Sequence, residues 1–287
     1  MKLHTFKIGG VHPEENKLSS DVVAVEAALP KVAVFPLSQH IGAPAKPVVG
    51  KGDKVKVGTM IAEASGFVSA PIFSSVSGTV AKIDTVIDAT GYQKPAIFIN
   101  VEGDEWEDRI DRSETLETLA NHPELTPEEI VARVKDAGVT GMGGAGFPTF
   151  IKLTPPPTAK AECVIINGVE CEPYITADYR LMMEHPDEIL VGLDLLMKAV
   201  RVEKGFIGIE ENKPEAIRLL TEKTAHDPRL EVVPLKQKYP QGGEKQLVDA
   251  VMNRQVPAPP AIPVSVGAVV QNVGTAYAVY QAVMKRK

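Results

Sequence analysis

A run of glycines near the middle of the chain is the first feature whose spacing could do chemistry. Gly141, Gly143, Gly144 and Gly146 fall within six residues, and Phe147 follows them. Glycines leave backbone N–H groups unshielded, which lets a flat or phosphorylated ligand approach closely. The spacing matches the dinucleotide fingerprint G-x-G-x-x-G, but that fingerprint requires a preceding strand, and here a helix is expected. The segment therefore predicts a ligand-binding loop between two helices, or else a flexible surface loop.

A second group of polar residues follows an apolar run at residues 162–167. Asn167 ends the expected strand, and Glu170, Cys171 and Glu172 come soon after it. Ligands bind at the carboxyl ends of strands in α/β sheets. Carboxylates accept hydrogen bonds from sugar hydroxyls, and an amide both donates and accepts them. The alternative is a solvated acidic loop, since such residues are usually exposed. Cys171 is expected to be a packed residue rather than a nucleophile.

Two further loops open expected helices at glycine residues. Gly243 and Glu244 begin one helix, and Asn272 and Thr275 flank the start of another. The amino end of a helix presents free N–H groups and partial positive charge, so both loops are suited to an anion. Each also has an explanation as ordinary helix capping. Four such loops in one region favour a ligand site.

The elements that must position these loops change character along the chain. Residues 31–101 contain short apolar runs separated by turn residues, which is typical of a small β domain. Residues 102–125 are charged and polar and predict a connection with a short helix. From residue 126 helices and strands alternate, which predicts a mostly parallel sheet covered by helices. We therefore expect an N-terminal segment at 1–30, a β domain at 31–101, a connector at 102–125 and an α/β domain at 126–287.

The expected elements can be given by residue number. The expected strands are 31–35, 55–63, 68–70, 78–87 and 96–101 in the β domain, and 162–167, 205–210, 230–235 and 267–271 in the α/β domain. The expected helices begin at 126 and 148 and cover 186–201, 214–226, 244–254 and 274–285.

The β domain resembles the barrel-sandwich fold of biotinyl and lipoyl domains. Residues 50–58 and 69–80 look like the hairpin pair of that fold. Those domains carry their prosthetic group on a lysine at the hairpin, and residues 57–81 contain no lysine. The sequence therefore predicts the fold without covalent biotin or lipoate.

Composition excludes several classes of function. The formal net charge of -6 argues against nucleic-acid binding, because neutralising phosphates needs clustered Lys and Arg. The first ten residues lack the apolar stretch of a signal peptide, and the apolar run at 262–270 is too short to span a bilayer. We expect a cytoplasmic protein whose membrane association comes through partners. Its two cysteines, Cys163 and Cys171, cannot hold a cubane cluster, which takes about four thiolates.

The four loops together resemble the FMN-site motifs of the NADH-binding subunit of respiratory complex I. The whole chain resembles the C subunit of the Rnf-type ferredoxin:NAD oxidoreductase complex. This resemblance implies a barrel-sandwich-hybrid β domain followed by a Rossmann-like, complex-I-type flavin domain. The segments that carry it are 141–149, 167–173, 243–244 and 272–275 in the flavin motifs, with 36–44 and 172–182 in addition for the C subunit.

The resemblance implies that FMN is held non-covalently and exchanges hydride directly with NAD(H), so that no side chain acts as a catalyst. Roles follow by position in the motifs. Gly141, Gly143, Gly144 and Gly146 would form the floor; Lys152, Asn272 and Thr275 would address the FMN phosphate; Asn167, Glu170 and Cys171 would line the ribityl chain and ring; Glu172 and Phe147 would face the nicotinamide nucleotide; and Gly243 and Glu244 would close the far side.

Two positions depart from the complex I pattern. Val169 stands where that pattern has an acidic residue, and Lys245 stands where it has a second glutamate. Members of the Rnf family continue into an iron–sulfur region, so we expect a shortened form whose clusters belong only to the missing part.

The implied role is an electron-entry module, peripheral on the inner face of the cell membrane. Other Rnf subunits would hold it there, and ferredoxin would be an indirect partner. In the whole complex, electron transfer would be coupled to ion translocation. Two alternatives remain: a docking scaffold that has lost its flavin, and a soluble flavoprotein reductase of the cobalamin- or amino-acid-reductase type.

Overall fold

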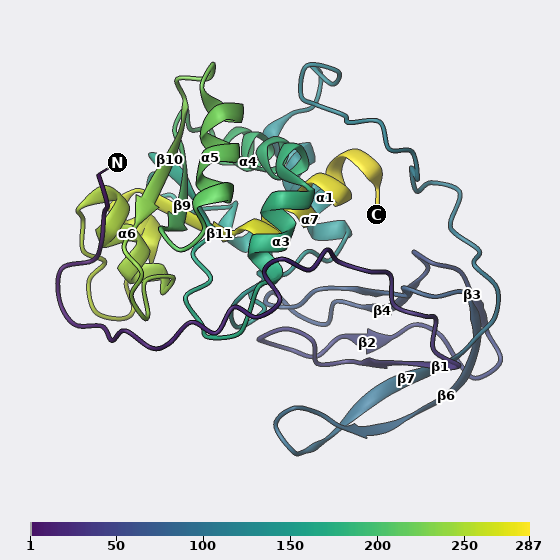
Figure 1. Cartoon of the computed structure of the whole chain (residues 1–287). Helices are drawn as coiled ribbons and strands as arrows, with labels where there is room; N and C mark the ends of the chain where they lie inside the picture. The colour runs from purple at the N-terminus through teal and green to yellow at the C-terminus, as the bar shows by residue number, and fades with distance from the viewer. Residues whose placement is uncertain (1) are drawn as a thin grey trace. The chain divides into compact units, whose positions relative to one another are not determined.

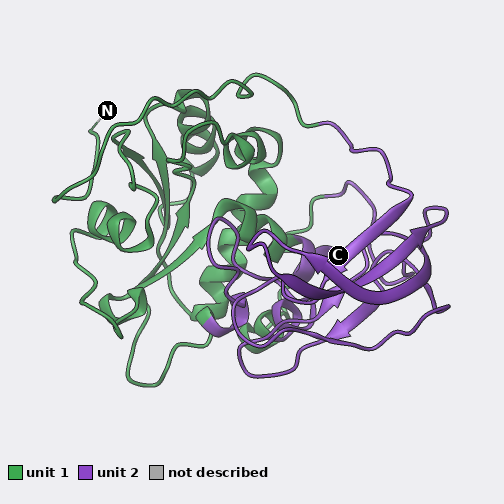
Figure 2. Ribbon diagram, turned by 90° about the horizontal axis from the view of Figure 1, so that it is seen from below, with its two compact units in different colours: residues 1–24, 116–131, 152–280 green, residues 25–115, 132–151, 281–287 purple. Residues whose placement is uncertain are grey.

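The computed structural model describes residues 2–287 and contains two compact units (Figures 1 and 2). Unit 1 comprises the residues up to Ala24 together with Leu116–Val131 and Lys152–Tyr280. Unit 2 comprises Val25–Thr115, Ala132–Ile151 and Gln281–Lys287. The units interleave along the chain, and the domain boundaries expected from the sequence stay a prediction.

Unit 1 is built on a four-stranded parallel sheet in the order β10-β9-β8-β11. From β8 (Cys163–Asn167) the chain steps outward to β9 (Gly205–Glu210) and β10 (Leu230–Leu235). It then returns to the other side of β8 as β11 (Ala268–Asn272). The strand order therefore reverses between β8 and β11. The carboxyl ends of strands at such a reversal border the crevice in which open α/β sheets bind ligands.

Helices cover both faces of this sheet (Figure 1). On one face α4 (Pro186–Val200) contacts β8 and β9, and α7 (Val273–Tyr280) contacts β8 and β11. On the other face α6 (Glu244–Met252) shares a buried cluster with alternate residues of β8, β10 and β11. α5 (Pro214–Thr224) packs against β10. The predicted α/β architecture with a parallel sheet is confirmed.

Some elements predicted from the sequence are absent from the part of the chain that the structure describes. The described residues 102–125 contain no helix, so the short helix expected there is wrong. Side-chain turns occupy part of that stretch instead, where Asp111 accepts from the Ser113 amide at 2.8 Å. The predicted strand at 68–70 is also wrong, because the Ser69 hydroxyl holds the Ser65 amide and the Ala43 carbonyl in a turn. The remaining elements of the α/β region are α1 (Pro127–Asp136), α2 (Thr149–Lys152), α3 (Ala177–Glu184), the 3-10 turn η1 (Pro263–Val266) and the π-helical turn η2 (Gln281–Lys285).

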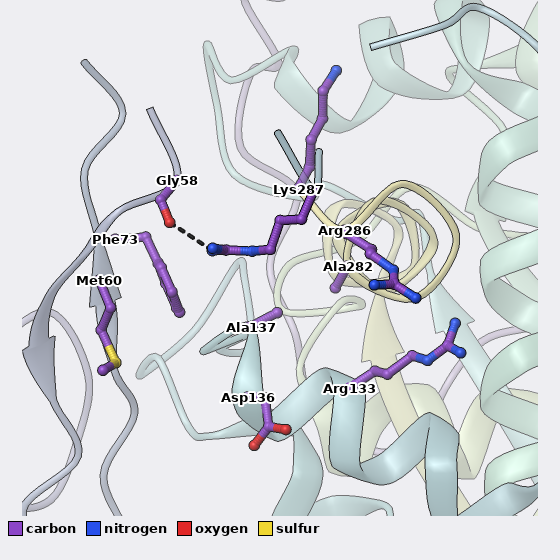
Figure 3. A pocket seen from close by; sticks show the side chains of 10 residues that line it. Gly58, Met60, Phe73, Arg133, Asp136, Ala137, Ala282, Arg286 and Lys287 are labelled. Atoms are coloured by element: carbon purple, nitrogen blue, oxygen red, sulfur yellow. Dashed lines mark hydrogen bonds between the residues drawn. The ribbon is translucent and has the colours of Figure 1, made fainter. Parts of the chain in front are cut away.

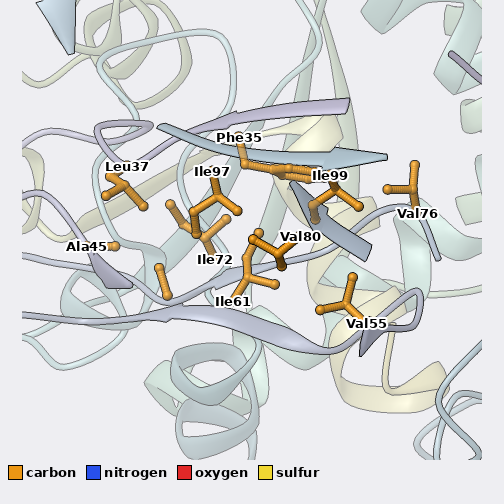
Figure 4. Packing of buried hydrophobic residues seen from close by; sticks show 11 residues of the cluster. Phe35, Leu37, Ala45, Val55, Ile61, Ile72, Val76, Val80, Ile97 and Ile99 are labelled. Atoms are coloured by element: carbon orange, nitrogen blue, oxygen red, sulfur yellow. The ribbon is translucent and has the colours of Figure 1, made fainter. Parts of the chain in front are cut away.

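Unit 2 contains two small antiparallel sheets that enclose an apolar core. Figure 4 shows the core, in which Phe35, Ile61, Ile97 and Ile99 are buried together. The predicted barrel-sandwich β domain is confirmed. One sheet has the order β1-β7-β6-β3 and the other β2-β4-β5, with β1 at Val32–Pro36, β2 at Lys46–Pro47, β3 at Lys54–Val55, β4 at Met60–Glu63, β5 at Ile72–Phe73, β6 at Gly78–Ile87 and β7 at Gln93–Val101.

Two further properties bear on function. No helix within residues 2–287 has the length and apolarity that a bilayer span requires. Within the same residues, no three His, Cys, Asp or Glu side chains are grouped so that they could hold a metal ion.

Candidate functional site

The carboxyl edge of the parallel sheet in unit 1 brings three of the four predicted loops together. Asn167 and Asn272 end β8 and β11 and are direct partners in the register of the two strands. The Asn167 amide donates to the Gly242 carbonyl oxygen at 2.8 Å, which ties the loop after β8 to the loop before α6. The Asn272 amide donates to the Asn167 carbonyl oxygen at 3.4 Å. Residues far apart in the sequence therefore meet where the strand order reverses.

Asn272 also organises the start of α7. Its side-chain oxygen accepts from the Gly274 amide at 2.7 Å, and its amide nitrogen donates to the Asp178 carboxylate at 2.6 Å. Burial raises the pKa of Asp178 to about 6, although the Asn272 hydrogen bond opposes this shift; the nearby Glu170 charge adds to it. Asp178 could not be identified as a site residue from the sequence, because its partner lies 94 positions along the chain.

Glu170 and Glu172 lie on the same loop but in different surroundings. Glu170 is 5% exposed, and its carboxylate accepts from the Asp178 and Tyr179 amides at 2.7 and 3.3 Å. It therefore stabilises the amino end of α3, where a negative charge is favourable. Glu172 is exposed, and its carboxylate has no hydrogen bond or ion pair to any residue in 2–287. The roles expected of Glu170 at the flavin and of Glu172 at the nicotinamide nucleotide stay predictions.

Cys171 packs against the glycine pair before α6. Its sulfur accepts from the Gly242 amide at 3.4 Å, and a Cβ added at Gly242 would lie 3.4 Å from that sulfur. Burial raises the pKa of the Cys171 thiol. A raised pKa keeps the thiol protonated at neutral pH, so this side chain is suited to packing rather than to nucleophilic attack.

A buried ion pair lies beneath these loops at the end of β9. The Glu210 and Lys213 side chains are 1% and 3% exposed, with 3.9 Å between the carboxylate oxygen and the ammonium nitrogen. Lys213 also donates to the Val169 carbonyl oxygen at 2.6 Å. Burial raises the pKa of Glu210 to about 7 and lowers that of Lys213, although the Glu210 charge opposes the latter shift. No sequence signal pointed to this pair, since neither residue belongs to a recognisable motif.

Lys152 and Thr275 are expected at the FMN phosphate, and Gly243 and Glu244 lie at the start of α6. Lys152 donates to the Glu244 carboxylate at 2.5 Å and to the Val270 carbonyl oxygen at 3.2 Å. Thr275 is fully buried in α7. Gly243 is the N-cap residue of α6 and has no side chain that could cap the first turn of that helix. Lys152 and Glu244 are thus neighbours. The expected contact of Lys152 with a phosphate and the expected place of Glu244 on the far side of the site stay predictions.

The glycine-rich segment Gly141–Phe147 belongs to unit 2. The Gly141 amide donates to the Phe147 carbonyl oxygen at 2.8 Å, which closes the segment into a loop. Gly143 and Gly146 have φ values of +69° and +66°, a left-handed conformation that favours glycine. A side chain at Gly146 would crowd the His40 backbone, whereas one at Gly144 would meet no atom within 4 Å. The expected role of the four glycines as a floor under flavin and dinucleotide stays a prediction, and so does the expected place of Phe147 facing the nicotinamide nucleotide.

Unit 2 also contains a cavity of about 610 Å³, shown in Figure 3. Arg109 lines it and donates to the Gly58 carbonyl oxygen at 2.6 Å, and Phe73 forms part of an apolar wall. Arg133 and Arg286 add positive charge to the lining. The residues that line this cavity include none of those predicted for the flavin site.

Comparison with known proteins identifies two family models that together match most of the chain. The Nuo51 FMN-binding domain matches residues 134–281, and the RnfC barrel sandwich hybrid domain matches residues 4–104. Curated relatives match along nearly the whole chain. The C subunit of the proton-translocating ferredoxin:NAD(+) oxidoreductase complex of Clostridium ljungdahlii is 45% identical over 98% of this chain. The C subunit of the Na(+)-translocating complex of Acetobacterium woodii is 44% identical over 96% of it.

A third relative is the C subunit of the ion-translocating oxidoreductase complex of Pseudomonas aeruginosa, which is 39% identical over 98% of this chain. The match covers 60% of the first relative, 61% of the second and 36% of the third. The chain thus spans about three fifths or less of these relatives. The resemblance drawn from the sequence motifs is confirmed.

Proposed function

The chain belongs to the family of the Nuo51 FMN-binding domain, and on this premise we propose that it is a flavin module that binds FMN and NAD(H) and passes hydride between them. When bound, the isoalloxazine ring of FMN supplies the redox chemistry, and the protein supplies binding, orientation and electrostatics. No side chain needs to act as an acid or a base in such a transfer.

The observation that carries this proposal is the pairing of Asn167 with Asn272 where the strand order reverses. A reversal of strand order in an open parallel sheet is where nucleotides bind. Hydrogen bonds at this edge fix the loop after β8, the loop before α6 and the start of α7 relative to one another. FMN carries a hydroxylated chain and a phosphate, which need the kind of amide groups and helix amino ends that this edge presents.

The proposed roles of individual residues follow from their surroundings. Asn167 holds two loops together and presents its backbone at the strand end. The uncapped first turn of α6, after Gly243, offers N–H groups to an anion, with Lys152 beside it. The exposed Glu172 carboxylate is available to ribose hydroxyls of the nicotinamide nucleotide. Glu170 acts mainly through α3, by fixing the loop that carries Glu172.

At the level of the assembly, the proposed module is the electron-entry part of an Rnf-type ferredoxin:NAD oxidoreductase. The curated relatives support this assignment, because they are subunits of such complexes. We propose that other subunits hold the module at the inner face of the cell membrane and link it to ferredoxin and to ion translocation.

Equilibrium binding of FMN tests the proposal. The 287-residue chain, freed of any flavin and titrated with FMN, is expected to quench flavin fluorescence with a Kd on the order of micromolar or tighter. Asn167→Ala removes the hydrogen bonds to Gly242 and Val169 and should raise the Kd at least about tenfold. Asn100→Ala, at an exposed position of β7, is the matched control and should leave the Kd unchanged. A folded wild-type chain that takes up no FMN would favour the docking scaffold instead.

A further inference from the structure

The N-terminal segment lies against the loops of the candidate site in unit 1. A backbone bridge pairs His4 with Leu235, and another pairs Val11 with Tyr239. Further along, the Lys17 ammonium donates to the Glu170, Glu172 and Ile175 carbonyl oxygens at 2.8, 2.8 and 2.6 Å. We propose that Lys17 is a positioning residue, whose ammonium group fixes the loop 170–175 and so sets where the Glu172 carboxylate stands. This inference rests on the proposed function, because it assigns Lys17 to the nucleotide site.

All three hydrogen-bond donors of the Lys17 ammonium group are used. An ammonium group has three N–H donors, and each of the three carbonyl oxygens lies at normal hydrogen-bond distance from the Lys17 nitrogen. Hydrogen bonds from a charged donor are stronger than those between neutral groups. The three carbonyl groups come from a single loop, so one side chain holds three of its peptide units in fixed orientations.

The loop needs such a restraint because its own backbone is partly strained. Glu170 and Tyr174 have φ values of +48° and +68°, in the left-handed region that non-glycine residues seldom adopt. From beneath, the buried Lys213 ammonium donates to the Val169 carbonyl oxygen at 2.6 Å. Two ammonium groups therefore hold the consecutive carbonyl groups of Val169 and Glu170, where the chain enters this loop. The Glu172 side chain, which neither of them engages, is left exposed.

Neighbouring residues make Lys17 part of a larger attachment. The backbone oxygen of Glu15 accepts from the Tyr174 amide at 2.8 Å, and the Ser19 and Thr176 hydroxyls are 2.7 Å apart. We call residues 15–20 the N-terminal clasp. If the clasp only anchored the chain terminus, losing Lys17 would lower stability without a specific effect on the loop or on nucleotide binding. A positioning role predicts effects confined to the loop and the nucleotide.

The test compares Lys17→Ala with Lys7→Ala, a lysine of the same segment whose ammonium group pairs with Asp249 at 3.8 Å and touches none of the loop carbonyls. Amide hydrogen exchange is measured for residues 168–176. NADH half-saturation is measured from the rate of flavin bleaching. Lys17→Ala should speed exchange in the loop at least about tenfold and raise the half-saturating NADH concentration by a similar factor, since three charged hydrogen bonds are lost. Lys7→Ala should change neither.

Chemical rescue separates a missing ammonium group from general damage. Methylammonium chloride should restore slow loop exchange and NADH saturation in Lys17→Ala, because it supplies N–H donors to the vacated carbonyl groups. Tetramethylammonium chloride at the same ionic strength has no N–H and should restore neither. Unchanged loop exchange in Lys17→Ala overturns the proposal, and so does faster exchange with unaltered NADH saturation. If the wild-type chain takes up no FMN, the proposed function fails, and the exchange comparison alone decides whether the clasp holds the loop.

Discussion

Ionisable side chains at the sheet edge are buried to an extent that ordinary surface loops do not show. Asp178 is partly buried beside Asn272, and Glu210 and Lys213 are almost fully buried one layer deeper. Burial raises the pKa of both acids, to about 6 and about 7 respectively. Buried ionisable groups with perturbed pKa values cluster at functional sites, although structural ion pairs show them too.

The raised pKa of Asp178 predicts a pH dependence of stability. Its folded-state pKa of about 6 lies above the ordinary value of 3.8, so the folded protein binds this proton more tightly than the unfolded chain does. The stability gained from that proton is complete below pH 4 and is lost as the pH rises through 6. A difference of roughly two pH units corresponds to about 3 kcal/mol as an upper bound.

Asp178→Asn mimics the protonated acid and does not titrate. The free energies of unfolding of variant and wild type should be similar at pH 4, and the variant should become more stable, by up to about 3 kcal/mol, near pH 7.5. Urea denaturation across that range measures the difference. Asp21→Asn, at an exposed position, serves as the control and should show no such trend. If the free energies of unfolding of Asp178→Asn and wild type differ by the same amount at every pH, Asp178 is not buried as described.

For individual residues, the sequence indicates where the loops lie but not which contacts hold them. Asn167 and Asn272 could be predicted at strand ends, because each follows an apolar run and precedes a glycine or a helix start. Their pairing depends on the order of strands in the sheet, which no local pattern encodes. Lys17 bonds to a residue 153 positions away, so its role could only emerge from the fold.

At the scale of elements, α4 and α7 pack unusually closely at Gly192. A methyl group at this position would overlap the backbone carbonyl group of Ala276 in α7. Helix propensity favours alanine over glycine by about 1 kcal/mol, whereas overpacking costs about 1–3 kcal/mol. Because backbone atoms cannot move aside as a flexible side chain can, we expect packing to decide the outcome.

Gly192→Ala should therefore lower the free energy of unfolding by about 1–2 kcal/mol, against its intrinsic propensity. Thermal or chemical denaturation measures the change. Gly50→Ala provides the comparison, because a Cβ there would approach only the Asp53 carboxylate, at 3.8 Å. A Gly192→Ala protein as stable as wild type would mean that α4 and α7 are less closely packed than the structure indicates.

Elements whose limits are set by the local sequence were predictable, and those held by distant partners were not. β6, β9 and β10 begin and end where the sequence predicts, because turn residues flank their apolar runs. The helix α3 was missed, since Glu170, which caps it, lies seven residues before its first residue. The helix expected within 102–125 failed because charged residues there form local side-chain turns instead of a periodic apolar face.

At the scale of the whole molecule, the fold class could be inferred from the change of periodicity along the chain. Alternating apolar residues gave way to helix and strand alternation, and the two matching family models cover those two regions. Composition alone could not show that the compact units draw on separate segments. Residues up to 24 join the parallel-sheet unit, and residues 132–151 join the unit of the β domain. Which unit a segment joins depends on contacts between residues that are distant in the sequence.

Hydride transfer from NADH can be followed in the visible spectrum of the flavin-loaded protein, recorded before and after anaerobic addition of NADH. If the chain binds FMN and accepts hydride from the nicotinamide, it should show protein-bound flavin absorbance that bleaches on addition of NADH. Absorbance that persists with excess NADH, in a folded protein that retains FMN, would contradict the proposed hydride transfer.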